Sequence, residues 1–387
     1  MTNQTLGNVA EPINLCILWI KHWLFWIVLI ILTPFEWLYF WGPNCSPRSR
    51  AFIHLLKITE YLNVKPKITE KDFDEPVPNT HYDKMLLLRK KLIRLFDESL
   101  HTCHPTLSMD VEKVKIQQVK IFCEASYKGN EKSFIIHTFN EEVAKTQKHK
   151  TTVLYFHGGG YLCGETSTYA NILSPWLYEN NYDCVLVDYT LCPYITPCGI
   201  LKQGSQAYNY VVHKLRINPK HLVVAGESAG ANLSLHVVLE TIKEGNIDEV
   251  PSSLVLFSPW VDLTLSTKSW KEVGPDVVLT DNMCRLGDKL DIWDQSNSLT
   301  FSPLFMDLSY LPPCFVSWGG DERLRDEAEQ LTANLKSFDV EVVQDVQKGM
   351  FHAFTLFHQY VPEGRNSLLN ASRFIEQHQP TCNAQYK

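Results

Sequence analysis

A serine stands at the centre of the pentapeptide GESAG, residues 226–230. An apolar run ends just before it, and a run typical of a helix, 231–240, follows it. A serine on a tight turn between a strand and a helix needs small neighbours, and such a turn exposes the hydroxyl for nucleophilic attack. The start of the helix also favours developing negative charge. The pattern therefore predicts that Ser228 is a nucleophile, with Ala229 directly after it.

Three consecutive glycines follow the apolar run 151–156 after one histidine: Gly158, Gly159 and Gly160. Residues without side chains let backbone N–H groups approach a substrate oxygen. Together with the N–H of Ala229, we expect these groups to form an oxyanion hole. A glycine-rich turn without a ligand and a phosphate-binding loop are the alternatives, although the spacing of the common phosphate-binding motifs is absent. We expect His157 to be a scaffold residue of this loop rather than a base.

A serine nucleophile also needs a base, and an acid that orients the base, in the chain order serine, acid, histidine. Asp321 and His352 each lie just past an apolar run, and α/β sheets place their sites at the carboxyl ends of strands. We expect His352 to accept the serine proton, and Asp321 to hold its tautomer and stabilise the imidazolium. Glu322, Asp326 and His358 are the alternatives. Asp326 lies within the following helical run and His358 lies later, so capping, surface or packing roles suit them better.

These side chains need a sheet to position them, and the second part of the chain supplies short apolar or β-branched runs. The runs are 114–122, 133–139, 151–160, 183–193, 221–230, 252–260, 314–322 and 340–346. The middle runs are almost continuously apolar, which is typical of strands buried on both faces of a parallel sheet. Helical stretches at 207–215, 231–244 and 324–338 separate the later runs. The alternation predicts an α/β fold with a mostly parallel sheet of about eight strands.

In this order, the segments HGGGY, GESAG, GGDERLRDEA and HAF resemble the hormone-sensitive-lipase-like branch of the α/β-hydrolases over about residues 110–380. The resemblance implies the α/β-hydrolase fold, an acyl-enzyme reaction at Ser228, and no cofactor or metal. It carries the triad over to Ser228, Asp321 and His352. The chain departs from the branch at Glu227, where an aspartate is usual, and this departure affects the bonding of the local loop.

The same resemblance implies a helical cap over the site. We expect it to come from residues 51–109 and from an insertion at about 262–300 within a catalytic domain spanning 110–387. Tyr161, Trp270 and Trp293 are the candidate pocket walls, and a core role is the alternative for the tryptophans. In the first of these regions, residues 81–96 have the apolar spacing of a helix with basic residues between. That helix is expected either on a membrane surface or packed over the catalytic core.

Five of the ten tryptophans lie in the first 43 residues: Trp19, Trp23, Trp26, Trp37 and Trp41. The segment 23–41 is long enough to span a bilayer, and tryptophans prefer its interfaces. We therefore expect residues 1–50 to form a single-pass membrane anchor and linker. An interfacial helix and a hairpin bent at Pro34 are the alternatives. A cleaved signal peptide is disfavoured because bulky residues follow the apolar run.

The location of the catalytic domain rests on opposing signals. Basic residues after the segment favour the cytosol by the positive-inside rule. An anchored hydrolase resembles arylacetamide deacetylases and fungal steryl acetyl hydrolases, which implies the endoplasmic reticulum membrane with a lumenal domain. Glycosylation sequons at Asn3, Asn44, Asn232 and Asn370 would matter only in a lumen. The odd number of cysteines, 11, leaves the compartment open.

Composition narrows the function classes. The chain is 45% hydrophobic and 12% aromatic, which excludes disorder, and its net charge of −7 argues against nucleic-acid binding. We expect a membrane-anchored serine carboxylic ester hydrolase that deacetylates lipophilic acetyl esters such as acetylated sterols. Acylglycerols and xenobiotic esters are the alternative substrates. An inactive hydrolase scaffold that binds lipids is the alternative outside enzymes.

Overall fold

One sheet organises the described part of the chain. The computed structural model describes residues 27, 45–61, 80, 83–92, 117–123, 132–138, 150–272, 276–281, 283–284 and 298–380. Its strands are β1 (Gln117–Cys123), β2 (Lys132–Thr138), β3 (Thr152–Phe156), β4 (Asp183–Asp188), β5 (Leu222–Glu227), β6 (Ser253–Phe257), β7 (Cys314–Gly319) and β8 (Val342–Gln347). These form a single eight-stranded sheet in the order β1-β2-β4-β3-β5-β6-β7-β8.

The sheet is mostly parallel, which confirms the predicted α/β fold. β1 pairs with β2, and β2 with β4, in antiparallel fashion. Every pair from β4 through β3 to β8 is parallel. The triad and oxyanion-hole residues predicted from the sequence follow β3, β5, β7 and β8. Because these strands are parallel, the residues that follow them meet at one edge of the sheet.

The sheet is buried on both faces, which explains the continuous apolar runs. Along β3, Val153 and Tyr155 belong to one core cluster, while Leu154 and Phe156 belong to the other. Side chains alternate between the two faces of a strand, so both sets must be apolar when helices cover both faces.

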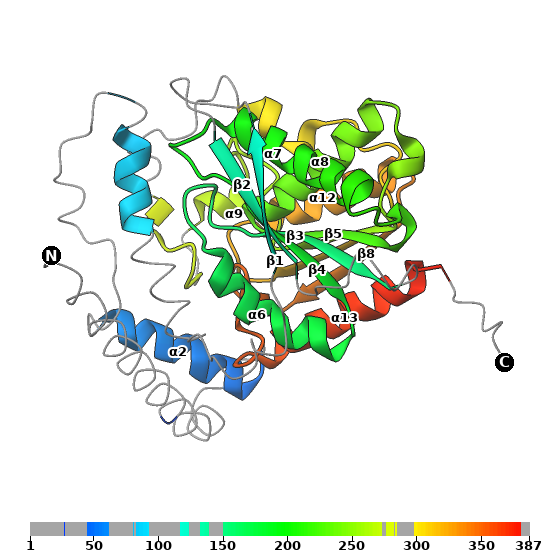
Figure 1. Ribbon diagram of the computed structural model, residues 1–387. Coiled ribbons are helices and arrows are strands. Elements are labelled where there is room, and N and C mark those ends of the chain that lie inside the picture. Colours follow the sequence, from blue (N-terminus) through cyan, green and yellow to red (C-terminus); the bar gives the residue numbers. More distant parts are fainter. Residues whose placement is uncertain are drawn as a thin grey trace, which may run out of the picture.

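Helices cover each face (Figure 1). α7 (Pro197–Asn209), α8 (Ala229–Lys243) and α12 (Arg325–Ser337) contribute to the first cluster. α6 (Thr166–Glu179), α13 (Pro362–His378) and the N-terminal part of α2 (Pro47–Tyr61) contribute to the second. Short helical turns lie between these elements: η1 (Tyr210–Lys214), η2 (Pro219–His221), η3 (Ile247–Glu249), α9 (Lys268–Lys271), η4 (Leu299–Phe301), η5 (Pro303–Phe305) and η6 (Phe354–Phe357).

The predicted cap region 51–109 lies mostly outside the described residues, but two of its helical parts are placed. Residues 83–92 are helical and bury Met85, Leu88 and Leu92 in the same cluster as α8. Of the two expectations for this helix, packing over the core is therefore the one that the structure favours. Phe52 of α2 packs against the rings of Phe351, Phe357 and Tyr360, which lie in the segment that follows β8.

The predicted anchor lies outside the described residues, apart from residue 27. Within the described part of the chain, no helix combines the length and the apolar character needed to cross a bilayer. Cys192 and Cys198 lie close enough in the chain to bridge a loop, but both are free thiols. Asn232 is completely buried and its side chain is hydrogen-bonded, so its sequon is not accessible in the folded protein.

Candidate active site

Ser228 lies at a sharp turn between β5 and α8, as predicted. Its backbone has φ 54° and ψ −121°, a conformation that is costly for a residue with a side chain and that is found at functional sites. The glycines on either side are required by space. A Cβ at Gly226 would lie 2.5 Å from the backbone of Gly230, and one at Gly230 would lie 2.0 Å from the carbonyl oxygen of Phe156. The GESAG pattern is therefore the consequence of packing this turn against β3.

His352 faces the serine. Its Nε2 lies 3.0 Å from Oγ of Ser228, although the two residues are 124 positions apart. Both are buried, with 3% and 8% of their surfaces exposed. His352 comes from the segment that joins β8 to η6. A buried imidazole at hydrogen-bond distance from a serine hydroxyl can remove its proton, as predicted.

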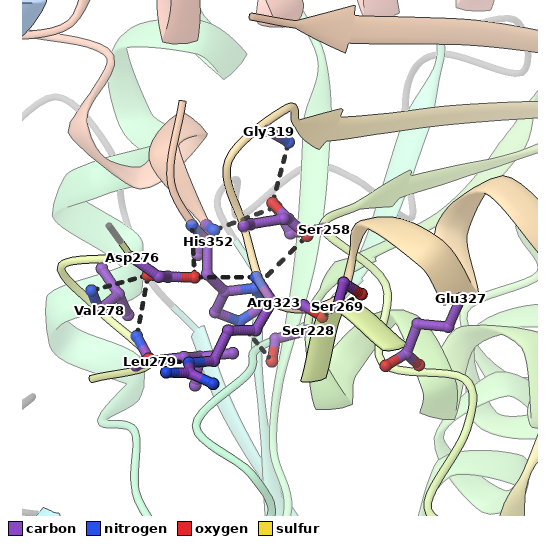
Figure 2. Close-up of polar contacts among 12 residues, drawn as sticks. Ser228, Ser258, Ser269, Asp276, Val278, Leu279, Gly319, Arg323, Glu327 and His352 are labelled. Atoms are coloured by element: carbon purple, nitrogen blue, oxygen red, sulfur yellow. Dashed lines mark hydrogen bonds and ion pairs between the residues drawn. The ribbon is translucent and has the colours of Figure 1, made fainter. Parts of the chain in front are cut away.

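Glu322 lies on the other side of the imidazole. Its Oε1 is 3.7 Å from Nδ1 of His352, and neither atom makes a hydrogen bond to any other described residue. This separation exceeds a hydrogen bond, but such contacts are often long in unliganded enzymes and tighten when substrate binds. The order Ser228, His352, Glu322 is thus continuous from hydroxyl to carboxylate. Figure 2 shows the contact between Ser228 and His352.

The expectation that Asp321 orients the histidine is corrected by this geometry. Asp321 donates its backbone N–H to the carbonyl of Met350 at 3.0 Å, and its side chain makes no hydrogen bond or ion pair with any described residue. The chain turns after β7, so adjacent side chains point in different directions and the second acidic residue faces the imidazole. Asp326 instead accepts from the N–H of Ser269, and His358 bonds to a carbonyl of α6.

The electrostatics of the pair favour a charged imidazole. Burial is the largest influence on the pKa of His352 and lowers it, but the Glu322 carboxylate, followed by Asp276 and Glu227, more than offsets burial and leaves the pKa raised. Burial raises the pKa of Glu322, and His352 opposes that rise. Because the imidazolium is the form that follows proton removal from serine, this arrangement stabilises the intermediate of the reaction.

Ser258 is a site residue that the sequence reasoning missed. The Oε2 atom of Glu322 accepts from the Ser258 hydroxyl at 2.7 Å and from the N–H of Gly319 at 2.9 Å. The same hydroxyl oxygen accepts the N–H of Ala353, the residue directly after the histidine, at 3.0 Å. Ser258 directly follows β6, at the carboxyl edge where the other site residues lie. Its position after an apolar run was the signal that could have identified it.

Replacing Ser258 with alanine is expected to lower kcat about 10-fold, because one hydrogen bond to a charged carboxylate is lost in a buried site. Steady-state kinetics on a short water-soluble ester measures the effect. Ser317→Ala is the matched control, since Ser317 is a buried serine on β7 whose hydroxyl bonds to Asp345 and Ser367 and not to the site. Equal losses in both variants would contradict a specific role for Ser258.

The glycine loop after β3 divides its N–H groups between two tasks. Gly158 donates to both carboxylate oxygens of Glu227, at 2.9 and 2.8 Å. Its N–H is therefore not available to a substrate, and the expectation for this residue is corrected. Gly159 and Gly160 have positive φ angles of 100° and 60°, and their N–H groups donate to no acceptor among the described residues. With Ala229 at the start of α8, they stay the candidate oxyanion donors.

Glu227 explains how the loop tolerates its departure from the family pattern. Besides Gly158, its carboxylate accepts from the hydroxyls of Tyr169 at 2.6 Å and Tyr155 at 3.3 Å. Burial raises the pKa of Glu227 to about 7, although these hydrogen bonds oppose the rise. A Cβ at Gly158 would lie 2.1 Å from Oε1 of Glu227. The carboxylate therefore anchors the glycine loop against β5.

Of the three predicted pocket walls, two have other contacts and one is not described. Tyr161 is buried and donates its hydroxyl to Oδ1 of Asn232 at 2.7 Å, so its side chain has a core role. Trp270 is partly buried against the core, and its carbonyl accepts from Arg323. Trp293 lies outside the described residues. The structure therefore assigns none of these three side chains to a pocket.

Comparisons with known proteins identify the family and the class of enzyme. Residues 153–356 match a family model described as alpha/beta hydrolase fold. An esterase of Acinetobacter venetianus is 28% identical over 237 residues, covering 60% of this chain and 77% of the relative. An acetyl-hydrolase of Streptomyces hygroscopicus is 26% identical over 244 residues, covering 62% and 80%. The solved structure of a hyperthermophilic esterase from Pyrobaculum calidifontis covers 86% of this chain and 98% of its own, with a TM-score of 0.63 and 22% identity.

Proposed function

Since the chain belongs to the alpha/beta hydrolase fold family and is a carboxylic ester hydrolase, we propose that Ser228, His352 and Glu322 are its catalytic triad. The observation that carries this proposal is the line from the serine hydroxyl through the imidazole to the buried carboxylate. The test is the pair of substitutions at Glu322 and Asp321, together with Ser228→Ala.

In this reaction, the hydroxyl of Ser228 attacks the acyl carbon while His352 takes its proton. The carbonyl oxygen becomes negative and accepts hydrogen bonds from the N–H groups of Gly159, Gly160 and Ala229. The C–O bond to the alcohol then breaks, and the imidazolium returns the proton to the leaving oxygen. Water then attacks the acyl carbon while His352 takes its proton, the bond from the acyl carbon to Oγ of Ser228 breaks, and the imidazolium returns the proton to Oγ as the acid leaves. Glu322 stabilises the imidazolium in both halves of the reaction.

The proposed substrates are acetyl esters of lipophilic alcohols, with acetylated sterols as the specific suggestion. The sequence similarity to an acetyl-hydrolase supports the small acyl group. The apolar, tryptophan-rich segment 23–41 supports a lipophilic alcohol, because an anchored enzyme meets esters that dissolve in the bilayer. The likeness to steryl acetyl hydrolases and arylacetamide deacetylases is a resemblance of motifs and supports the same choice.

The proposed location is the endoplasmic reticulum membrane, with residues 23–41 as a single-pass anchor. The resemblance supports a lumenal catalytic domain, while the basic residues after the segment favour the cytosol. With Asn232 buried, Asn370 is the sequon in the described catalytic domain at which a glycan would report the lumen.

Full-length protein in lipid vesicles is expected to hydrolyse a sterol acetate with a kcat/KM at least about 10-fold above that for the same sterol carrying a long acyl chain. The reason is that a pocket shaped for a small acyl group discriminates steeply against added methylenes. Release of the sterol is measured by chromatography, and p-nitrophenyl acetate in water serves as the control for intact chemistry.

Three other outcomes would contradict the proposed substrate class, the anchor or the activity. Faster turnover of acylglycerols or of long-chain esters would contradict the proposed substrate class. Release of the protein into a carbonate wash of the vesicles would contradict the anchor. Failure of Ser228 to react with a fluorophosphonate would instead indicate an inactive scaffold that binds lipids.

A further inference from the structure

A second buried carboxylate, Asp276, lies beside the triad and belongs to the insertion between β6 and β7. It is 6% exposed. Its Oδ1 accepts the N–H groups of Val278 and Leu279 at 2.9 and 3.0 Å, which shapes its own turn. Its Oδ2 reaches out of the insertion and accepts the N–H of Arg323 at 3.2 Å and the N–H of His352 at 3.4 Å (Figure 2).

The two N–H groups that donate to Oδ2 of Asp276 lie in the two loops that carry the base and the acid. One is the backbone N–H of the histidine itself. The other belongs to Arg323, the residue directly after Glu322. A single oxygen therefore connects the loop after β7, which carries the acid, to the loop after β8, which carries the base. The same two loops follow strands that are neighbours in the sheet, and they are also joined by the Asp321 N–H to Met350 carbonyl bond and through Ser258.

The side chain of Arg323 provides a second connection, from the loop after β7 to the insertion. Its guanidinium donates to the carbonyls of Trp270, Glu272 and Leu279, at 2.7, 3.0 and 2.9 Å. It also forms an ion pair with Asp281. All four partners belong to the insertion. The acid loop thus holds the insertion through the Arg323 side chain, and the insertion holds both catalytic loops through the Asp276 carboxylate.

We infer that Asp276 is a positioning residue for ester hydrolysis, because its carboxylate sets the backbone of the base and of the acid loop against the insertion. This inference rests on the proposed triad. Asp276 touches no reacting atom in the proposed reaction, and it acts through His352 and through the turn that carries Glu322. The insertion, predicted as part of the cap, is by this connection also a support for the catalytic geometry.

Asp276 also contributes charge at the imidazole. Three carboxyl groups from different elements raise the pKa of His352: Glu322 after β7, Asp276 in the insertion, and Glu227 at the end of β5. The guanidinium of Arg323 is directed to the insertion carbonyls. A negative group held beside the ring favours the imidazolium, so removal of the Asp276 charge is expected to make His352 lose its proton at lower pH.

The substitution Asp276→Asn removes the charge and one pair of acceptor positions while keeping the shape of the side chain. We expect kcat per active site to fall about 10- to 100-fold with little change in KM for a short ester, because a small misplacement of a catalytic group has effects of this size. The acidic limb of the kcat/KM profile should move to lower pH. Full-length enzyme is used, and active sites are counted with a fluorophosphonate so that folding losses are separated from catalytic losses.

Asp262→Asn is the matched control. Asp262 is also a buried aspartate of the insertion, but the described residues that donate to its carboxylate are Thr264 and Ser266, both in its own turn. The control is expected to keep the wild-type pH profile and kcat per active site. A fall in the active fraction of Asp276→Asn, with wild-type kcat and pH profile per active site, would show a merely structural role and overturn the inference.

Asp276→Glu separates the effect of the negative charge from the effect of the carboxylate position. It also provides the test if the asparagine variant does not fold. The charge is kept, but the longer side chain cannot hold the same geometry. The acidic limb should stay near that of the wild type while kcat per active site falls, and wild-type kcat in this variant would contradict the positioning role. If Glu322→Gln lowers activity and neither Asp276 variant does, this inference fails and the triad stands. Full activity of Glu322→Gln would remove the triad itself.

Discussion

Replacing Glu322 with glutamine is expected to lower kcat about 10³- to 10⁴-fold, whereas Asp321→Asn is expected to leave kcat close to that of the wild type. The geometry gives the reason. Ser258 and Gly319 both donate hydrogen bonds to Oε2 of Glu322, so the oxygen of a glutamine amide would occupy that position. Its NH₂ group would then face Nδ1 of His352. A donor there forces the proton onto Nε2, where it prevents the ring from accepting the proton of Ser228.

The pH dependence of the residual activity provides a second readout of the same substitution. In the wild type, the Glu322 carboxylate is the leading influence that raises the pKa of His352 against the effect of burial. The base works only when the imidazole is neutral, so activity is lost as pH falls through this raised pKa. Glutamine removes the negative charge and lowers the pKa of His352. The acidic limb of kcat/KM should therefore shift to lower pH in Glu322→Gln and stay in place in Asp321→Asn.

The two variants together make a sharp comparison because the residues are adjacent and both are acidic. Single-turnover kinetics with p-nitrophenyl acetate measures acylation in each. Asp321→Asn is the matched control, since Asp321 contributes a backbone hydrogen bond that asparagine keeps. A large loss in Asp321→Asn with near-normal activity in Glu322→Gln would restore the original expectation from the sequence and contradict the structure.

Some parts of the fold and of the site could be predicted from the sequence because their constraints are local or repeat along the chain. The serine turn could be predicted because its constraints are local: Gly226 and Gly230 are needed wherever a strand, a tight turn and a helix pack against a neighbouring strand. The sheet could be predicted because burial on both faces demands continuous apolar runs. His352 followed from its place after a strand, since the carboxyl ends of parallel strands meet at one edge.

The remaining parts depend on contacts between residues far apart in the chain. The choice between Asp321 and Glu322 depends on the path of the chain after β7 and on Ser258, which is 64 positions from the acid. The use of the Gly158 N–H depends on Glu227, 69 positions away. Asp276 has no recognisable motif around it, because its partners are backbone N–H groups that any residue could supply. Patterns of residue type carry no information on such partners.

Replacing Ser228 with alanine is expected to reduce ester hydrolysis about 10⁶-fold. The acyl-enzyme cannot form without the hydroxyl, and the remaining groups can only assist a weak attack by water. The oxyanion donors and the binding of the ester survive the change, so a small residual rate above the uncatalysed reaction should persist. Steady-state hydrolysis of p-nitrophenyl acetate, with loss of fluorophosphonate labelling, measures the effect.

The same substitution separates chemistry from stability. Ser228 has a positive φ angle that alanine tolerates no better, so the strain of the turn is kept. The hydroxyl bonds to His352, and its backbone N–H donates to Phe257, a bond that alanine preserves. The melting temperature should therefore stay near that of the wild type while activity disappears. Ser234→Ala is the control for a buried serine of α8, since among the described residues its hydroxyl bonds to the carbonyl of Gly230, within the helix. Hydrolysis by Ser228→Ala at the rate of this control would exclude the serine as nucleophile and, with it, the acyl-enzyme mechanism.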